Sequence, residues 1–132
     1  MAKTFQQMVA EGREGTPMIS PQDAQKRMQD DPNTLMIDVR DAADVAGTGI
    51  IPGAQNVSLG MLPVRADQDV PEAARNKDLQ DRSRPIITTC AAGGQASLAA
   101  KTLKDMGFTN VSIMEGGTKG WKDAGLETEE PS

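Results

Sequence analysis

Short runs of apolar residues, several of them β-branched, alternate along this chain of 132 residues with stretches in which apolar positions recur every three or four residues. The apolar runs predict strands and the periodic stretches predict helices. The predicted strands cover residues 18–19, 35–39, 54–58, 85–89 and 111–114. The predicted helices cover residues 4–11, 20–28, 41–45 and the stretch after Gly94, with a short one near 71–75 and a last one around Trp121. This alternation indicates an α/β fold: a small, mostly parallel sheet of four or five strands flanked by helices on both faces.

The chain length fits a single domain. We expect one domain over residues 1–132, with its core at about 18–126, an N-terminal helix at 4–11 that ends before Gly12, and a mobile acidic tail at 127–132. Residues 60–84 are polar and irregular apart from the short helix. Within that segment, residues 61–64 form either a lid over a site or an apolar interaction patch, and the sequence leaves both open.

The composition excludes several kinds of site. The chain has no histidine, which rules out Cys–His and Ser–His–Asp catalysis within it, and its single cysteine leaves no ligand set for zinc. We therefore expect no metal and no other cofactor. A net charge of −5 without a basic cluster argues against nucleic acid or an anionic membrane as a partner. The apolar runs are too short to span a bilayer, and one cysteine cannot form an internal disulfide, which fits a cytoplasmic protein.

Cys90 follows the predicted strand at 85–89 and precedes the small residues 91–94. Ligands gather at the carboxyl ends of strands in open α/β sheets, and the free N–H groups that begin a helix favour a thiolate over a thiol. A free cysteine also often does no more than pack in a core. The pair Gly93 and Gly94 favours a functional cysteine, because a packing residue does not require them. We expect its thiol to be partly reachable by solvent.

Four segments in this order resemble a single-domain rhodanese, a member of the sulfurtransferase family. They are the strand end at 37–41, the loop at 49–54, the cysteine loop and its helix at 90–103, and the Glu-Gly-Gly sequence at 115–117 followed by Gly120 and Trp121. Together they cover roughly residues 19–125. The resemblance implies a rhodanese-like fold and sulfurtransferase activity.

The resemblance also implies a mechanism centred on Cys90. In that family the loop cysteine takes a sulfane sulfur from a donor, becomes a persulfide and passes the outer sulfur to a thiol or another nucleophile. A persulfide is anionic, and successive backbone N–H groups can surround it as an anion-binding nest. The expected sulfur-binding residues are Ala91, Ala92, Gly93, Gly94, Gln95 and Ala96. The partners would be a small-molecule or protein sulfur donor and acceptor, and the protein a monomer or a homodimer.

The cysteine loop departs from the family pattern in its charge. Loops active on thiosulfate usually carry an arginine five residues after the cysteine and often a basic residue directly after it, where this chain has Gln95 and Ala91. Charge-assisted hydrogen bonds to a dianion contribute roughly 1.5–3 kcal/mol each, so we expect weak activity with thiosulfate. The same loss leaves a second interpretation open: a catalytically silent rhodanese-fold binding or regulatory module. A cysteine phosphatase fails on spacing, because Ala96 stands where it needs an arginine.

Other candidate residues have simpler interpretations. Asp38 and Arg40 are expected to form a structural network at a strand end, and Trp121 to anchor packing. Five methionines at apolar positions are expected to fill the core: Met8, Met28, Met36, Met106 and Met114. Four arginines outside the loop could bring a positive charge to the site: Arg65, Arg75, Arg82 and Arg84.

Overall fold

The computed structural model describes residues 2–131, so that Met1 and Ser132, the ends of the expected domain, lie outside the described residues. The strands are β1 (Met18–Ile19), β2 (Leu35–Asp38), β3 (Gln55–Asn56), β4 (Ile86–Thr89) and β5 (Val111–Met114). The α-helices are α1 (Phe5–Arg13), α2 (Pro21–Asp30), α3 (Ala42–Thr48), α4 (Leu62–Ala66), α5 (Gly94–Asp105) and α6 (Gly117–Asp123). Two 3-10 turns, Glu72–Ala74 and Lys77–Leu79, lie between α4 and β4. Within residues 2–131, no helix has the length and apolar character needed to cross a membrane.

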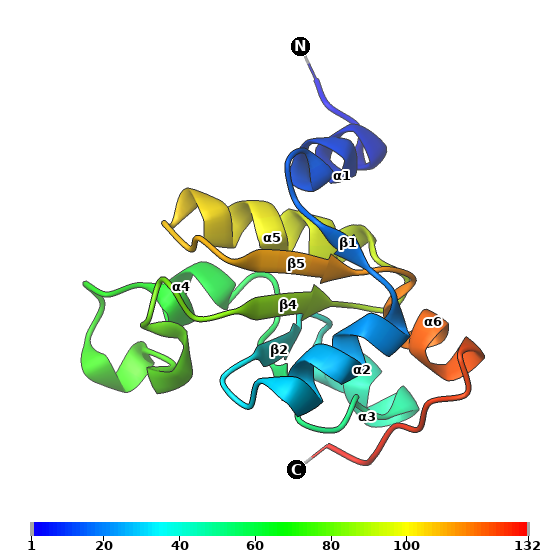
Figure 1. The fold of residues 1–132 in the computed structure, drawn as a ribbon. Helices are drawn as coiled ribbons and strands as arrows, with labels where there is room; N and C mark the ends of the chain where they lie inside the picture. Colours follow the sequence, from blue (N-terminus) through cyan, green and yellow to red (C-terminus); the bar gives the residue numbers. More distant parts are fainter. Residues whose placement is uncertain (1, 132) are drawn as a thin grey trace.

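The five strands form one sheet in the order β1-β5-β4-β2-β3, and each neighbouring pair is parallel. Parallel neighbours need crossover connections, and helices supply them on both sides of the sheet. Helices α1, α4 and α5 lie on one side, and α2, α3 and α6 lie on the other (Figure 1). The predicted α/β fold with a parallel sheet covered on both faces is confirmed.

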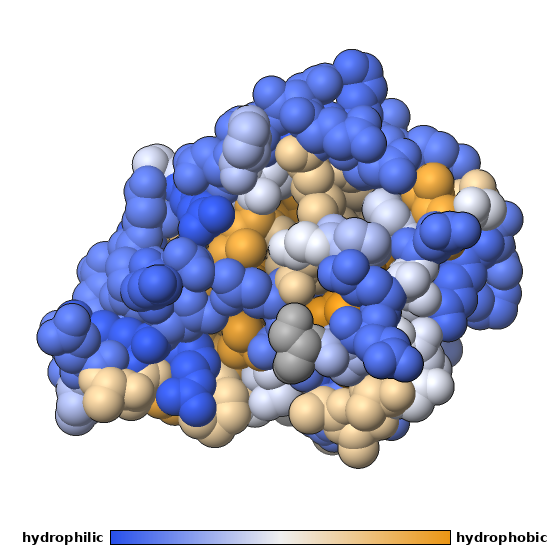
Figure 2. Space-filling view, turned by 90° about the horizontal axis from the view of Figure 1, so that it is seen from below, coloured by the Kyte–Doolittle hydropathy of each residue, from blue (hydrophilic) through white to orange (hydrophobic). Residues whose placement is uncertain are grey.

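Each face of the sheet has its own apolar core. Strands β2 and β4 are buried along their whole length, which explains why they read as continuous apolar runs rather than as alternating patterns. The core under α4 and α5 includes Ile37, Leu62, Ile86 and Leu103. The core under α2 and α6 includes Met36, Ile87, Met114 and Trp121. The outer surface of this second side is mostly hydrophilic, with hydrophobic residues visible in its hollowed middle (Figure 2).

Helix α1 extends to Arg13. The prediction that it ends before Gly12 is wrong, because Gly12 lies inside the helix. Gly12 is buried against α5, and a Cβ built on it would lie 2.2 Å from the carbonyl oxygen of Ser97. The missing side chain therefore lets the two helices touch through their backbones. Near the other end of α1, the ring of Phe5 lies over Gly94, whose Cβ would be 2.7 Å from the Phe5 Cζ atom. Helix α1 thus forms an additional outer layer on top of the beginning of α5.

The segment at 60–84 is more regular than predicted. Pro63 lies in the first turn of α4, where a backbone N–H has no helical acceptor and proline is therefore tolerated. Leu62 is fully buried in the core, so α4 packs on the core and is not a lid, whereas Met61 directly before it is 39% exposed. The short helix predicted at 71–75 exists as the 3-10 turn Glu72–Ala74.

The acidic tail is attached to the domain, in contrast to the expected mobile segment. Glu129 and Ile50 exchange two backbone hydrogen bonds of 2.8 Å as an antiparallel bridge. The indole N–H of Trp121 donates to the carbonyl oxygen of Glu127 at 2.8 Å. The expected mobility was inferred from the polar composition of the tail. The backbone groups of Glu127 and Glu129 nevertheless have hydrogen-bond partners elsewhere in the domain.

Of the five methionines expected to fill the core, four lie there and one does not. Met36 and Met114 are fully buried, and Met28 and Met106 are partly buried against the two cores. Met8 is 43% exposed, so its assignment to the core is wrong. It lies on α1, which covers α5 and whose outer side no described helix or strand covers (Figure 1).

Candidate functional site

Cys90 lies directly after β4, at the carboxyl end of the middle strand, and α5 begins four residues later at Gly94. Gly93, the residue before α5, has a φ of +113°, a left-handed conformation that glycine adopts without strain. This conformation turns the chain from the strand into the helix within a few residues. The predicted order of strand, tight loop and helix around Cys90 is confirmed.

Two backbone N–H groups of this loop point at the cysteine sulfur. The N–H of Gly93 donates to Sγ of Cys90 at 3.0 Å, and the N–H of Ala96 donates at 3.3 Å. Both donors, together with the beginning of α5, favour negative charge on the sulfur. Within residues 2–131, the other loop residues expected to bind sulfur do not donate to this atom: Ala91, Ala92, Gly94 and Gln95.

The thiol is turned into the protein, in contrast to the expected partly accessible sulfur. Only 2% of Cys90 is exposed, and the residue belongs to the core under α5. Its two N–H donors hold the sulfur beneath the loop. The exposed surface of the loop is formed by Ala91, Ala92 and Gln95.

Helix α6 holds the loop from the outside. The N–H of Thr118 donates to the carbonyl oxygen of Cys90 at 2.8 Å, and the N–H of Lys119 donates to that of Ala91 at 3.2 Å. Gly117 permits this approach, because a Cβ on it would lie 2.4 Å from the Cys90 oxygen. The Glu-Gly-Gly sequence before Trp121 therefore brings the first turn of α6 against the cysteine loop.

Asp38 and Arg40 form a buried ion pair at the end of β2. Asp38 is 0% exposed and Arg40 is 3% exposed, and Nη2 of the arginine lies 2.6 Å from Oδ2 of the aspartate. The guanidinium also donates to Thr48 Oγ1 at 2.5 Å and to the Gly49 carbonyl oxygen at 2.9 Å. These partners agree with the expected structural role, because they tie β2 to the end of α3.

A surface pocket of about 280 Å³ opens beside Ala91. Its wall includes positively charged side chains, and its lining residues are Arg40, Thr48, Ala91, Thr118, Lys119 and Lys122. A hydrogen bond to Asp123, and then the charge of that carboxylate, raise the pKa of Lys119 above its ordinary value. Lys119 is therefore positively charged at neutral pH.

A further positive charge beside the loop comes from Arg13, which was not among the candidates drawn from the sequence. Nε of Arg13, at the end of α1, donates to Ser97 Oγ at 3.0 Å. The four arginines considered from the sequence donate instead to backbone carbonyl oxygens elsewhere. The pairs are Arg65 with Ala74, Arg75 with Val70, Arg82 with Leu79, and Arg84 with Asn33. Because 84 positions separate Arg13 from Ser97, no local pattern in the sequence connects them.

The family model of the Rhodanese-like domain matches residues 20–124, most of the chain. The chain belongs to this family. It is 32% identical over 99 residues to a rhodanese domain-containing protein of Drosophila melanogaster, an alignment that covers 73% of this chain and 88% of that one.

Solved structures also resemble this rhodanese-like domain over nearly its whole length. A polysulfide-sulfur transferase homodimer from Wolinella succinogenes has a TM-score of 0.75 and 31% identity, covering 97% of this chain and 88% of that one. A protein of unknown function from Rhodopseudomonas palustris, described as a possible tyrosine phosphatase, has a TM-score of 0.88 and 28% identity, covering 98% and 96%. The family and the sulfur transferase relative support a sulfurtransferase-type function for this domain. Within residues 2–131, no three His, Cys, Asp or Glu side chains gather where they could hold a metal ion.

Proposed function

We propose that this protein is a sulfurtransferase that carries sulfane sulfur as a persulfide on Cys90. The observation that carries the proposal is the pair of N–H groups, from Gly93 and Ala96, that donate to the cysteine sulfur at 3.0 and 3.3 Å. Such donors stabilise the Cys90 thiolate, which is the nucleophile when sulfur is taken up and the leaving group when sulfur is passed on. The 31% identity to a polysulfide-sulfur transferase agrees with this chemistry.

The proposed reaction has two displacement steps, and neither needs an external oxidant or reductant. In the first, the Cys90 thiolate attacks the sulfane sulfur of the donor. A new S–S bond forms, the donor's S–S bond breaks, and the leaving group departs with the electron pair. In the second, an acceptor thiolate attacks the outer sulfur of the persulfide and the Cys90 thiolate leaves, which restores the free enzyme. The N–H groups of Gly93 and Ala96 stabilise the Cys90 thiolate before the first step and after the second step.

A donor with less negative charge than the thiosulfate dianion, such as a hydrogen polysulfide monoanion or an organic persulfide, suits this loop better than thiosulfate. Gln95 is exposed and uncharged, and Ala91 is an apolar residue, so the loop itself offers no cation to a dianion. The donor and acceptor, whether small molecules or proteins, are proposed to meet Cys90 in the cytoplasm, with the protein a monomer or a homodimer. The net charge of −5 argues against nucleic acid or anionic membranes as partners.

Phosphatase activity, suggested for the relative from Rhodopseudomonas palustris, does not suit this loop. A cysteine phosphatase needs an arginine six residues after its cysteine to clamp the phosphate, and that position is Ala96 here. The N–H of Ala96 is already directed at the Cys90 sulfur. No side chain of this loop can therefore replace the missing guanidinium.

One observation favours a second candidate function, a silent rhodanese-fold binding or regulatory module. The thiol is only 2% exposed, so a donor reaches it only after the loop opens or shifts. Sulfur uptake on Cys90 separates the two candidates, because a silent module does not acquire a persulfide.

The deciding experiment is intact-mass analysis of the protein after exposure to polysulfide, thiosulfate and an organic persulfide, with cyanide added afterwards to remove sulfane sulfur. We expect polysulfide to add the mass of one sulfur to the wild type, and cyanide to remove it. The Cys90→Ser variant is the control and gains nothing. An unchanged wild-type mass with all three donors, for protein shown to be folded by its circular dichroism, refutes the sulfurtransferase and leaves the binding module.

A further inference from the structure

Arg13 lies against the cysteine loop although it belongs to α1. Its Nε donates to Ser97 Oγ at 3.0 Å, and that hydroxyl donates to the carbonyl oxygen of Gly93 at 2.9 Å. Its Nη2 lies 3.5 Å from the position that a Cβ of Gly93 would occupy. Gly93 is the residue whose N–H donates to the Cys90 sulfur. The guanidinium thus lies beside the residue whose N–H donates to the reactive sulfur.

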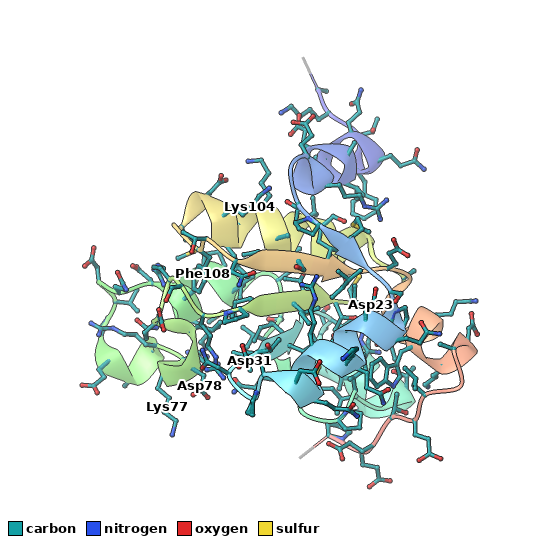
Figure 3. The ribbon with its side chains drawn as sticks, in the orientation of Figure 1. Asp23, Asp31, Lys77, Asp78, Lys104 and Phe108 are labelled. Atoms are coloured by element: carbon teal, nitrogen blue, oxygen red, sulfur yellow. The ribbon has the colours of Figure 1, made fainter. Side chains whose placement is uncertain are left out.

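The end of α1 is fixed in this place by contacts with α5. The backbone of Gly12 rests on the carbonyl oxygen of Ser97, as described above. At the last turn of α5, Nζ of Lys104 donates to the carbonyl oxygen of Glu14 at 2.9 Å and contacts the Thr16 hydroxyl. Lys104 rises from α5 on the side where α1 lies (Figure 3). The residues directly before and after Arg13, Gly12 and Glu14, are therefore both held against α5.

The charge of Arg13 is not neutralised by an ion pair. Within residues 2–131, no carboxylate lies within 4.0 Å of its guanidinium, and the nearby Glu11 is paired with Lys3 at 2.7 Å. The loop that Arg13 contacts carries no charged side chain, because none occurs between Arg84 and Lys101. Arg13 is exposed, so an anion in solution can also reach it.

We propose that Arg13 provides, from α1, the positive charge that related loops carry at the position of Gln95. It acts as a positioning and specificity residue: it draws an anionic sulfur donor toward the loop, and through Ser97 it holds Gly93 with its N–H on the sulfur. This inference rests on the proposed function of Cys90. Its substrate consequence is a preference for a singly charged anionic donor, such as a hydrogen polysulfide, over a neutral one of similar size.

The test measures the electrostatic potential at Cys90 without relying on sulfur transfer. Cys90 is the only thiol, so its rate of modification can be compared for a negatively and a positively charged alkanethiosulfonate of similar size. Each reagent forms a mixed disulfide with the thiolate and releases a sulfinate. For Arg13→Gln, we expect the ratio of the negative to the positive reagent's rate to fall about three- to tenfold at low salt. Arg13→Lys should keep most of the wild-type ratio.

The matched control is Lys26→Gln, which removes the same charge from α2 on the other side of the sheet. It should leave the ratio unchanged. In the wild type, raising the salt concentration should lower the ratio, a result that needs no variant. An equal ratio for wild type and Arg13→Gln, with Cys90 reacting normally, overturns the role of Arg13. Failure of Cys90 to react with either reagent instead overturns the proposed function, because no donor could reach the sulfur.

Discussion

Replacing Gly12 with alanine should loosen the contact between α1 and α5. The added Cβ would lie 2.2 Å from the Ser97 carbonyl oxygen and 2.7 Å from the Ser97 carbonyl carbon. Both atoms are backbone atoms inside a helix, so no side chain can rotate away to make room. The helices must move apart, and the Arg13 guanidinium moves with α1.

The expected cost follows from two opposing effects. Overpacking of a buried contact costs about 1–3 kcal/mol of unfolding free energy. Alanine is a better helix former than glycine by about 0.5–1 kcal/mol, which offsets part of this loss. Because the obstacle is rigid backbone, we expect the upper part of the overpacking range and a net destabilisation of about 1–2 kcal/mol.

Urea unfolding followed by circular dichroism measures this change as a lower midpoint with an unchanged slope. Gly47→Ala in α3 is the matched control, since Gly47 is exposed and its added Cβ would meet no atom within 4 Å. This control should stabilise the protein by about 0.5–1 kcal/mol, because it gains only helix propensity. If Gly12→Ala proves as stabilising as Gly47→Ala, the close backbone contact between α1 and α5 is refuted.

Three further substitutions test other parts of the structure. Asp38→Asn should lower the unfolding free energy by about 3–5 kcal/mol in urea titrations, because Arg40 is left as an uncompensated buried charge; a loss below about 1 kcal/mol would contradict this. Gln95→Arg should raise thiosulfate turnover by about tenfold at low salt, and a neutral donor's turnover much less; equal gains for both donors would show that charge is not the cause. Trp121→Phe should remove the hydrogen bond to Glu127 and speed amide exchange in the tail, with a stability loss of about 0.5–1.5 kcal/mol; unchanged exchange would mean that other contacts hold the tail.

The sheet and the cysteine loop could be predicted because their signals are local. Strands β2 and β4 are buried on both faces, so they appear in the sequence as uninterrupted apolar runs. The turn after Cys90 needs a residue with positive φ, and Gly93 supplies it within the same short stretch. These features depend on neighbours in the sequence, which a single chain displays directly.

The prediction that Gly12 ends the first helix is wrong because glycine has two uses in helices. Glycine often ends a helix, but at Gly12 it allows close packing against another helix. The deciding factor is the tertiary neighbour of the glycine, which helix propensity alone does not reveal.

The remaining features of the site depend on contacts across the whole chain. Whether the Cys90 sulfur points outward or inward is decided by which N–H groups surround it, and the apolar pattern does not specify them. Arg13 reaches the loop only because α1 packs on α5. The bridge between Ile50 and Glu129 is likewise a pairing of distant segments.

Helix α6 sets the polarity of the peptide groups in the cysteine loop. The C=O and N–H of a trans peptide point in opposite directions, so the carbonyls of Cys90 and Ala91 that face α6 turn the N–H groups of Ala91 and Ala92 away from it. Within residues 2–131 these two N–H groups have no protein acceptor. The dipoles of the loop are therefore aligned by a helix that lies outside it. A transplant of residues 90–97 onto another α/β scaffold would reproduce the loop's sequence without its alignment, unless the new scaffold also presents the first turn of a helix to those two carbonyls.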